Sequence, residues 1–239
     1  MSGHSKWNNI KHKKEKTDAQ RAKVFTKVGK EIAMAVREGG PEPVSNSKLR
    51  DLITKAKSLN VPNENIERII KKASGADGVQ YESVQYEGYG PGGVAVIVEA
   101  ATDNRNRTAG DVRHYFDKFG GNMGTTGCVS YLFTEKGIIV VSGIKDEDAF
   151  MEDALDSGAS DCNCEGGNGE VVTEPAELSA VREALEAKGY TVESAETEKI
   201  PSNYVSLTEE HSEKMGRLLE YLEDNDDVTE VWHNWDEEE

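Results

Sequence analysis

The sequence contains few cysteines and no long apolar run, and these absences exclude several classes of protein. Among 239 residues there are three cysteines, Cys128, Cys162 and Cys164. An odd number of cysteines in a chain of this length is not a disulfide framework and agrees with a reducing compartment. No segment approaches the ~20 consecutive apolar residues that cross a bilayer, so we expect no membrane-spanning helix and no membrane partner.

Targeting signals are missing from the basic start of the chain. No apolar segment follows it, as a secretory signal requires, and Ser2 stands where N-myristoylation needs glycine. A mitochondrial presequence would be Arg-rich and amphipathic, whereas this start is Lys-rich without an apolar face before residue 19. We therefore expect a cytoplasmic protein.

Patterns typical of enzymes are also missing. No Ser/His/Asp set, HExxH motif or carboxylate pair stands out among 45 acidic residues. Cys162 and Cys164 form a single C-x-C at the spacing of a half-buried strand, with a metal site as the alternative. The glycine-rich Gly120–Gly127 lacks the ending of a P-loop, which favours a chain-reversing loop over an RNA-contacting one. We expect a protein that is not an enzyme and that uses no cofactor, metal or small-molecule substrate.

Charge is divided sharply along the chain, whose formal net charge is −17. Residues 1–72 contain 17 Lys and Arg against 8 acids, a net charge of +9, whereas residues 73–239 contain 11 against 37, a net charge of −26. Exposed charges more than ~8 Å apart are largely screened at physiological ionic strength. A basic head can therefore bind a polyanion while the acidic remainder is held away from it.

The first thirty residues concentrate this positive charge, with nine cations and two acids. Trp7 and His12 lie among them, and planar rings stack on bases while ammonium groups bind phosphate. A solvated tail without a partner is the alternative, but the charge division favours nucleic acid. The predicted binding residues of the head are Lys6, Trp7, Lys11, His12, Lys13, Lys14, Lys16, Arg21, Lys23 and Lys27.

Apolar spacing predicts three helices after a basic arm at residues 1–18: from residue 19 to Gly39–Gly40, from Asn46 or Ser47 to residue 59, and from Pro62 to Gly75. Together they make a helical bundle at residues 19–77. Its polar faces present ten cations, which we interpret as an electrostatic footprint. These are Lys23, Lys27, Lys30, Lys48, Arg50, Lys55, Lys57, Arg68, Lys71 and Lys72.

Strand-like patterns follow at 81–88, 94–100 and 129–133, with a helix before the last of them. Residues 137–197 read β-α-β-β-α-β, the order of a ferredoxin-like unit. A helix at 207–223 and a strand at 227–232 lack partners nearby and complete the earlier unit. We therefore predict an α+β multidomain fold: a three-helix bundle followed by two α/β (ferredoxin-like) domains, with the second (135–204, acidic) inserted in the first (78–134 plus 205–239).

A second candidate site is Asn104-Arg105-Asn106-Arg107, at the predicted start of a helix. Cations there oppose the helix dipole by about 0.3–1 kcal/mol each, so helix propensity does not explain them. An anion held between helix amides and two guanidinium groups would explain them, and pairing with Asp103 or Asp111 is the structural alternative. We add Asn104, Arg105, Asn106, Arg107 and Arg113 to the predicted nucleic-acid-binding residues.

Five segments resemble the YebC family, which includes the mitochondrial translational activator of cytochrome c oxidase subunit I. They are Gly3–Lys14, Ile66–Ala73, Tyr86–Glu99, Thr102–His114 and Gly120–Tyr131. The resemblance implies three domains around a cleft and no enzymatic activity. Bacterial members are described as probable DNA-binding transcriptional regulators, and evidence on the family also points to translation at the ribosome. The acidic segment Asp146–Lys199 departs most from the family pattern.

Together, these observations predict a monomeric regulator of gene expression that binds nucleic acid. A ribosome- or rRNA-associated translation factor is favoured, because the arm with Trp7 suits looped RNA and no helix displays a row of Arg, Asn and Gln for a major groove. A DNA-binding transcriptional regulator is the alternative. An enzyme dependent on metal or phosphate, acting at Cys162 and Cys164 or at the 104–107 site, is a weaker one.

Overall fold

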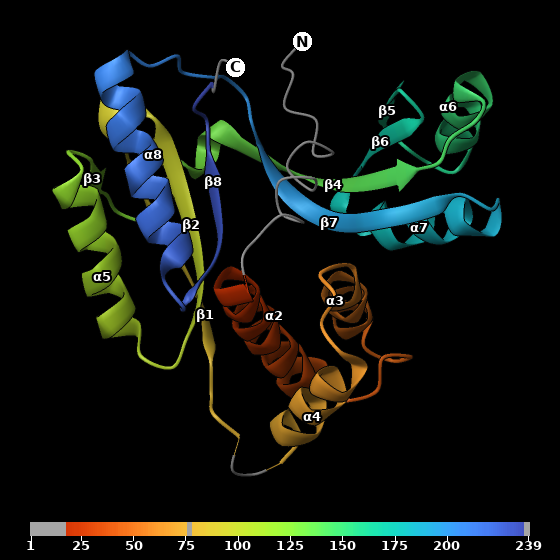
Figure 1. The fold of residues 1–239 in the computed structure, drawn as a ribbon, viewed down its shortest axis with the longest axis horizontal. Helices are drawn as coiled ribbons and strands as arrows, with labels where there is room; N and C mark the ends of the chain where they lie inside the picture. Colours follow the sequence, from red (N-terminus) through yellow and green to blue (C-terminus); the bar gives the residue numbers. More distant parts are fainter. Residues whose placement is uncertain (1–17, 76–77, 237–239) are drawn as a thin grey trace.

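The computed structural model of the protein describes residues 18–75 and 78–236, with side chains from Ala22 onward. A bundle of three helices is followed by two α/β domains, each built on a four-stranded sheet (Figure 1). The second domain lies between the third and last strands of the first in sequence. The predicted α+β architecture, with one α/β domain inserted in the other, is confirmed.

The bundle consists of α2 (Asp18–Gly39), α3 (Ser47–Ser58) and α4 (Asn63–Ala73). Asn46 begins α3 by accepting a hydrogen bond from the amide of Leu49, and its side-chain amide donates to the carbonyls of Ala35 and Gly40 at 2.8 Å. This one buried side chain therefore fixes both the start of α3 and its angle to the end of α2. Pro62 lies just before α4 as its cap.

The first sheet contains β1 (Glu82–Tyr89), β2 (Ala95–Thr102), β3 (Asn122–Met123) and β8 (Val228–His233), in the antiparallel order β3-β1-β2-β8. Two helices, α5 (Arg105–Lys118) and α8 (Glu209–Asp224), cover one face (Figure 1). Phe116 and Leu218 meet the inward valines of β2 in its apolar core. The late helix and strand thus complete the first sheet, as predicted.

The inserted domain runs β4 (Phe133–Ser142), α6 (Glu147–Asp156), β5 (Asp161–Glu165), β6 (Asn168–Thr173), α7 (Leu178–Ala187) and β7 (Thr191–Pro201). Its strand order, β5-β6-β4-β7, is that of the predicted ferredoxin-like unit. Cys162 and Cys164 are free thiols whose half-buried side chains pack against the core of this domain. Within residues 18–75 and 78–236, no cluster of three His, Cys, Asp or Glu side chains is arranged to hold a metal ion.

One local prediction was wrong. Residues 129–133 do not form a strand: Ser130–Leu132 is a turn of 3-10 helix, and β4 begins at Phe133. The cause is Glu87, whose buried carboxylate accepts hydrogen bonds from the amides of Val129 and Ser130 and removes them from strand pairing. The glycine-rich loop also contains the short strand β3, which pairs with the end of β1.

None of the described helices has the length and apolarity needed to span a bilayer.

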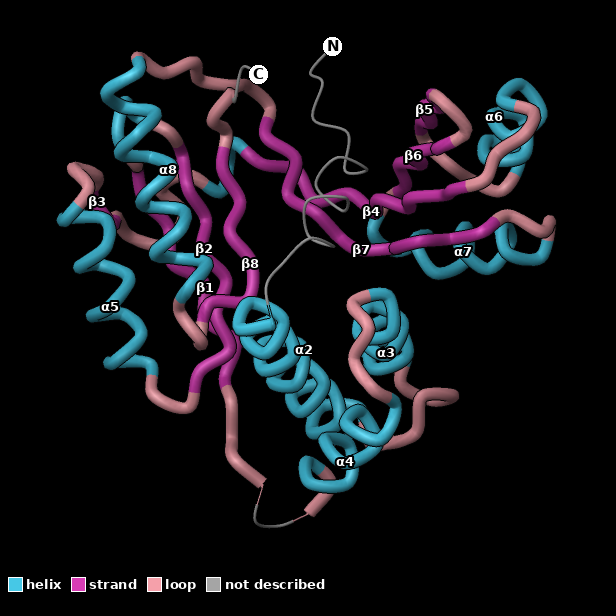
Figure 2. The backbone as a smooth tube through the Cα atoms, in the orientation of Figure 1, coloured by secondary structure: helices cyan, strands magenta, loops and turns pink. Residues whose placement is uncertain are grey.

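The joint between the units is ionic, and its centre is Lys55 of α3. Its Nζ lies 2.8 Å from Glu230 on β8, 3.5 Å from Glu31 on α2 and 3.9 Å from Glu196 on β7. Although burial opposes protonation, these carboxylates raise the pKa of Lys55 well above its ordinary value. One lysine therefore connects the bundle, the first sheet and the inserted domain, in the region where α2 and α3 approach β8 and β7 (Figure 2).

Further ion pairs surround Lys55. Lys199 on β7 pairs with Glu99 on β2, and its Nζ lies 3.1 Å from Glu135. Arg182 on α7, which is 5% exposed, lies 3.0 Å from Asp51 on α3. Asp51 also accepts a hydrogen bond from Ser179. The inserted domain is thus tied to both other units by charged groups.

Candidate nucleic-acid interface

Nearly all of the predicted arm lies outside the described residues. Seven of the predicted binding residues lie outside the described residues: Lys6, Trp7, Lys11, His12, Lys13, Lys14 and Lys16. Arg21 lies on α2, but its side chain is also outside the described part. Their role remains a prediction from the sequence.

Lys23 and Lys27 lie against the C-terminal end of α8. Lys27 donates to the carbonyl of Glu223, and Lys23 donates to the carbonyl of Asp224 at 3.2 Å and pairs with its carboxylate. The last carbonyls of a helix carry partial negative charge and attract cations. The C-terminal end of α8 therefore binds these two amines, whereas the sequence predicts that they face solvent.

Lys30, one turn further along α2, is buried. Its Nζ lies 2.6 Å from the carboxylate of Asp227 and 2.8 Å from the carbonyl of Asp226. Lys30 and the half-buried Lys55 are therefore paired inside the protein, and fewer than the ten predicted cations face solvent. The cations that stay exposed on α3 and α4 are Lys48, which pairs with Glu38, and Lys57, Arg68, Lys71 and Lys72.

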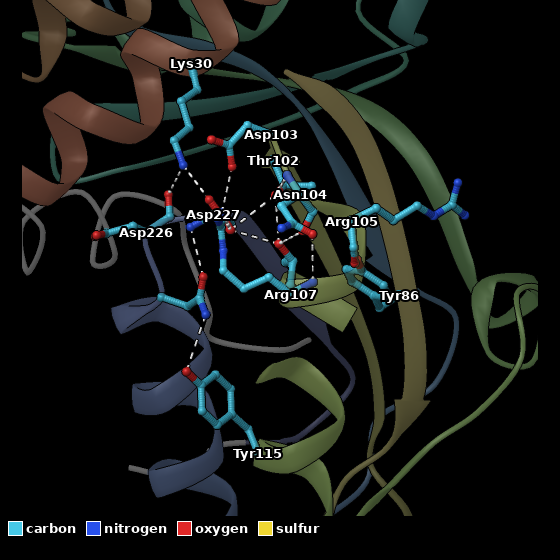
Figure 3. A network of polar contacts seen from close by, with 12 residues as sticks. Lys30, Tyr86, Thr102, Asp103, Asn104, Arg105, Arg107, Tyr115, Asp226 and Asp227 are labelled. Carbon is cyan, nitrogen blue, oxygen red and sulfur yellow. Dashed lines mark hydrogen bonds and ion pairs between the residues drawn. The ribbon is translucent and has the colours of Figure 1, made fainter. Parts of the chain in front are cut away.

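The motif at the start of α5 surrounds the same Asp227 (Figure 3). Asn104 caps the helix by accepting a hydrogen bond from the amide of Arg107 at 3.1 Å. The guanidinium of Arg107 donates to Asp227 at 2.6 Å and to Asp103 at 2.8 Å. Asp227 also accepts a hydrogen bond from Thr108 at 2.8 Å. Although burial opposes ionisation, hydrogen bonds from Arg107, Lys30 and Thr108 lower the pKa of Asp227 to about 2.

The structure therefore shows the pairing alternative for Arg107, with Asp103 and the unforeseen Asp227 as counter-ions in place of an external anion. Arg105 behaves differently: its exposed side chain points away from the cluster, while its carbonyl accepts a hydrogen bond from Tyr86 (Figure 3). Asn106 and Arg113 are also exposed on α5. The motif therefore has a structural half, Asn104 and Arg107, and a surface half, Arg105 and Asn106.

An open pocket of about 420 Å³ lies beside this cluster. Four aspartates line it (Asp103, Asp111, Asp226 and Asp227), against the two cations Lys30 and Arg107. The excess of carboxylates disfavours phosphate in this pocket.

Proteins of the same length and arrangement are known. A protein from Acetivibrio thermocellus named "Probable transcriptional regulatory protein" is 59% identical over 239 residues, which cover 98% of this chain and 99% of that protein. One from Caldicellulosiruptor bescii with the same name is 57% identical over 242 residues, with both chains fully covered. The crystal structure of a conserved hypothetical protein from Aquifex aeolicus superposes with a TM-score of 0.82 at 48% identity and covers 92% of each chain.

These relatives and the fold define a class of three-domain proteins with a helical head and an inserted α/β domain. Residues 5–76 match the family model of the TACO1/YebC protein N-terminal domain, and residues 81–235 match that of the TACO1/YebC second and third domain. The chain belongs to the YebC family, which confirms the resemblance read from the sequence.

Proposed function

We propose that this protein is a non-enzymatic regulator of gene expression that binds nucleic acid and acts at the ribosome through ribosomal RNA. The observation that supports this proposal most is the charge division, +9 in residues 1–72 against −26 in the remainder. The internal ion pairs use Lys30 of α2 and Lys55 of α3, so the head cations available to a partner include the exposed Lys57, Lys71 and Lys72. The acidic domains would then orient the head and suppress nonspecific coating of RNA.

Cosedimentation of the full-length protein with purified ribosomes tests this proposal. If the head neutralises about five phosphates, a plot of log K against log salt falls with a slope of about −3.5 to −4.5. Deleting residues 1–17 should weaken binding about tenfold or more, which is about 1.4 kcal/mol. The matched control replaces Lys13 and Lys14 by arginine, which keeps the charge and should leave binding unchanged. A salt-independent affinity would contradict electrostatic docking.

Two further variants in the same assay separate the two halves of the α5 motif. Arg105→Lys should weaken binding several-fold without changing the melting temperature, because its exposed guanidinium can hold phosphate through two donors. Arg107→Lys should instead lower the melting temperature, because Arg107 bridges Asp103 and Asp227. Wild-type affinity for Arg105→Lys would remove Arg105 from the interface.

A DNA-binding transcriptional regulator is the second candidate, and the names of the relatives favour it. Titration with double-stranded promoter fragments at the same ionic strength distinguishes the two. A sequence-specific footprint at concentrations that leave ribosomes unbound would select DNA. Metal analysis of the purified protein tests the remaining alternative, an enzyme that uses Cys162 and Cys164.

A further inference from the structure

The loop between α5 and β4 is uncharged and close to a sheet edge. Residues 119–133 contain no Lys, Arg, Asp or Glu, in a chain of which 31% is charged. The loop includes β3, the edge strand of the first sheet, and it leads into the inserted domain. The side chains of the loop therefore add no charge of their own that would repel a polyanion.

Glycines allow the backbone of this loop to contact the backbone of β1 directly. A Cβ atom on Gly121 would lie 2.6 Å from the carbonyl oxygen of Tyr89, and one on Gly88 would lie 2.6 Å from that of Asn122. Real Cβ atoms do not approach backbone so closely, so these positions accept only glycine unless the backbone moves. The two backbones are consequently in direct contact, and the loop has little freedom to shift along the strand.

A buried carboxylate fixes the second half of the loop. Glu87, which is 1% exposed, accepts hydrogen bonds from the amides of Gly127 at 2.8 Å, Val129 at 3.0 Å and Ser130 at 2.9 Å. Although burial opposes ionisation, these bonds lower the pKa of Glu87 below its ordinary value. The buried Glu87 carboxylate thus holds the backbone of this loop in one geometry. Binding sites need such support when their geometry must be kept.

The side chain that this backbone presents is Tyr131, which is 73% exposed. Tyr89, which is 37% exposed, contacts the Tyr131 side chain and donates from its hydroxyl to the carbonyl of Cys128 at 3.2 Å. Asn122, Thr125 and the other exposed residues of the loop are small and polar. Core packing does not explain an aromatic ring held this far into solvent by so constrained a backbone.

We propose that this loop is a second nucleic-acid contact, in which Tyr131, with Tyr89 beside it, stacks on an unpaired base of RNA. An exposed ring on a rigid support stacks on any base, and neutral side chains around it can bond base edges. A protein partner fits less well, because the other exposed residues of the loop are glycine, threonine and asparagine and do not add to an apolar patch. The inference rests on the proposed function and assigns it a site remote in sequence from the basic head.

Binding of a fluorescent single-stranded oligoribonucleotide to the full-length protein tests the inference. Tyr131→Ala should weaken binding roughly 5- to 100-fold, the effect of losing one stacked base. Tyr131→Phe is the matched control and should bind within about twofold of the unmodified protein. A blunt RNA duplex of equal length, whose bases are already stacked, should bind both variants alike.

Melting temperatures should be the same for all three proteins, because the ring is exposed. If Tyr131→Ala binds the single strand like the unmodified protein while deletion of residues 1–17 weakens ribosome binding, the stacking site is wrong and the proposed function stands. If the duplex loses as much affinity as the single strand, Tyr131 does not recognise unpaired bases. If the unmodified protein binds neither RNA nor ribosomes, both proposals fail.

Discussion

The interiors of the three units and the ion pairs that join them are built from opposite materials. Each unit has its own apolar cluster, with Ile32 in the bundle, Phe116 in the first sheet and Phe150 in the inserted domain. The joint centres on Lys55 and Lys199 and their carboxylates. Apolar burial stabilises without direction, whereas a half-buried ion pair gains little net stability but is lost when the geometry changes. The units thus depend on their cores for stability and on the joint for orientation.

The register of the first sheet shows why the joint has one arrangement. Glu99 on β2 and Glu230 on β8 lie directly opposite each other, a destabilising position for two like charges. Each carboxylate receives a lysine from a different unit, Lys199 from the inserted domain and Lys55 from the bundle. Correct docking of both units therefore removes a repulsion that the isolated sheet would retain.

The largest effect should come from a core. Phe116→Ala removes a fully buried ring from the first domain and should lower the free energy of unfolding by about 3–5 kcal/mol. Urea denaturation at low and high salt measures it, and the loss should be equal at both, because dispersion and apolar burial are not screened. A strongly salt-dependent loss would mean that the core and the joint are not separate contributions.

Lys55→Met should come next, with a loss of about 3 kcal/mol, because three glutamates are left half-buried without their cation. Denaturation of the double variant Lys55→Met/Glu230→Gln supplies the control, and it should recover part of the loss. Scattering should show the single variant as less compact while far-ultraviolet circular dichroism stays the same. Full stability of the single variant would show that Lys55 is not the centre of the joint.

Asp227 should contribute less, about 2 kcal/mol at neutral pH, since its pKa falls from an ordinary 3.8 to about 2 in the folded state. A lowered carboxyl pKa stabilises the fold above the unfolded-state value, and the contribution is lost as pH falls from about 4 towards 2. Asp227→Asn should remove the contribution at pH 7 and flatten this part of the stability profile. An unchanged acid limb in the variant would assign the transition to other carboxyl groups.

The smallest effect should come from the rim of the same joint. Lys23 pairs with Asp224, but their side chains are 37% and 68% exposed, so water and salt screen the pair. Lys23→Met should change stability by less than about 0.5 kcal/mol. Thermal melts measured beside Lys55→Met provide the comparison, and similar losses from both would contradict a joint with a distinct centre and rim.

Periodicity was sufficient to predict most of the fold. The helices of the head followed from apolar spacing, and the leftover elements α8 and β8 indicated the insertion, because an α/β unit without a complete sheet needs partners from elsewhere. The strand expected at 129–133 is not formed. Its β-branched and aromatic residues suggest strand pairing, but the amides of Val129 and Ser130 donate to Glu87, which lies more than 40 positions away. Such contacts between a side chain and a distant backbone amide produce no periodic pattern in the sequence.

The candidate site was harder to predict, for an electrostatic reason. With 45 acidic residues in the chain, the sequence does not tell which carboxylate meets which cation. Arg107 and Asp227 are 120 positions apart, and Lys55 and Glu230 are 175 apart. The sequence therefore establishes that the net charge of the head is positive. It does not show that acidic residues of the two α/β domains pair with several of the head's cations.

The place of β8 in the first sheet sets an order for folding during synthesis. Its partner β2 ends at Thr102, whereas β8 begins only at Val228, after the whole inserted domain has been made. Until then β2, almost entirely apolar, is an unpaired edge strand, and such edges promote aggregation. The last strand is thus a closing strand, and chains that stop before it should be recovered in aggregates even though the inserted domain is complete.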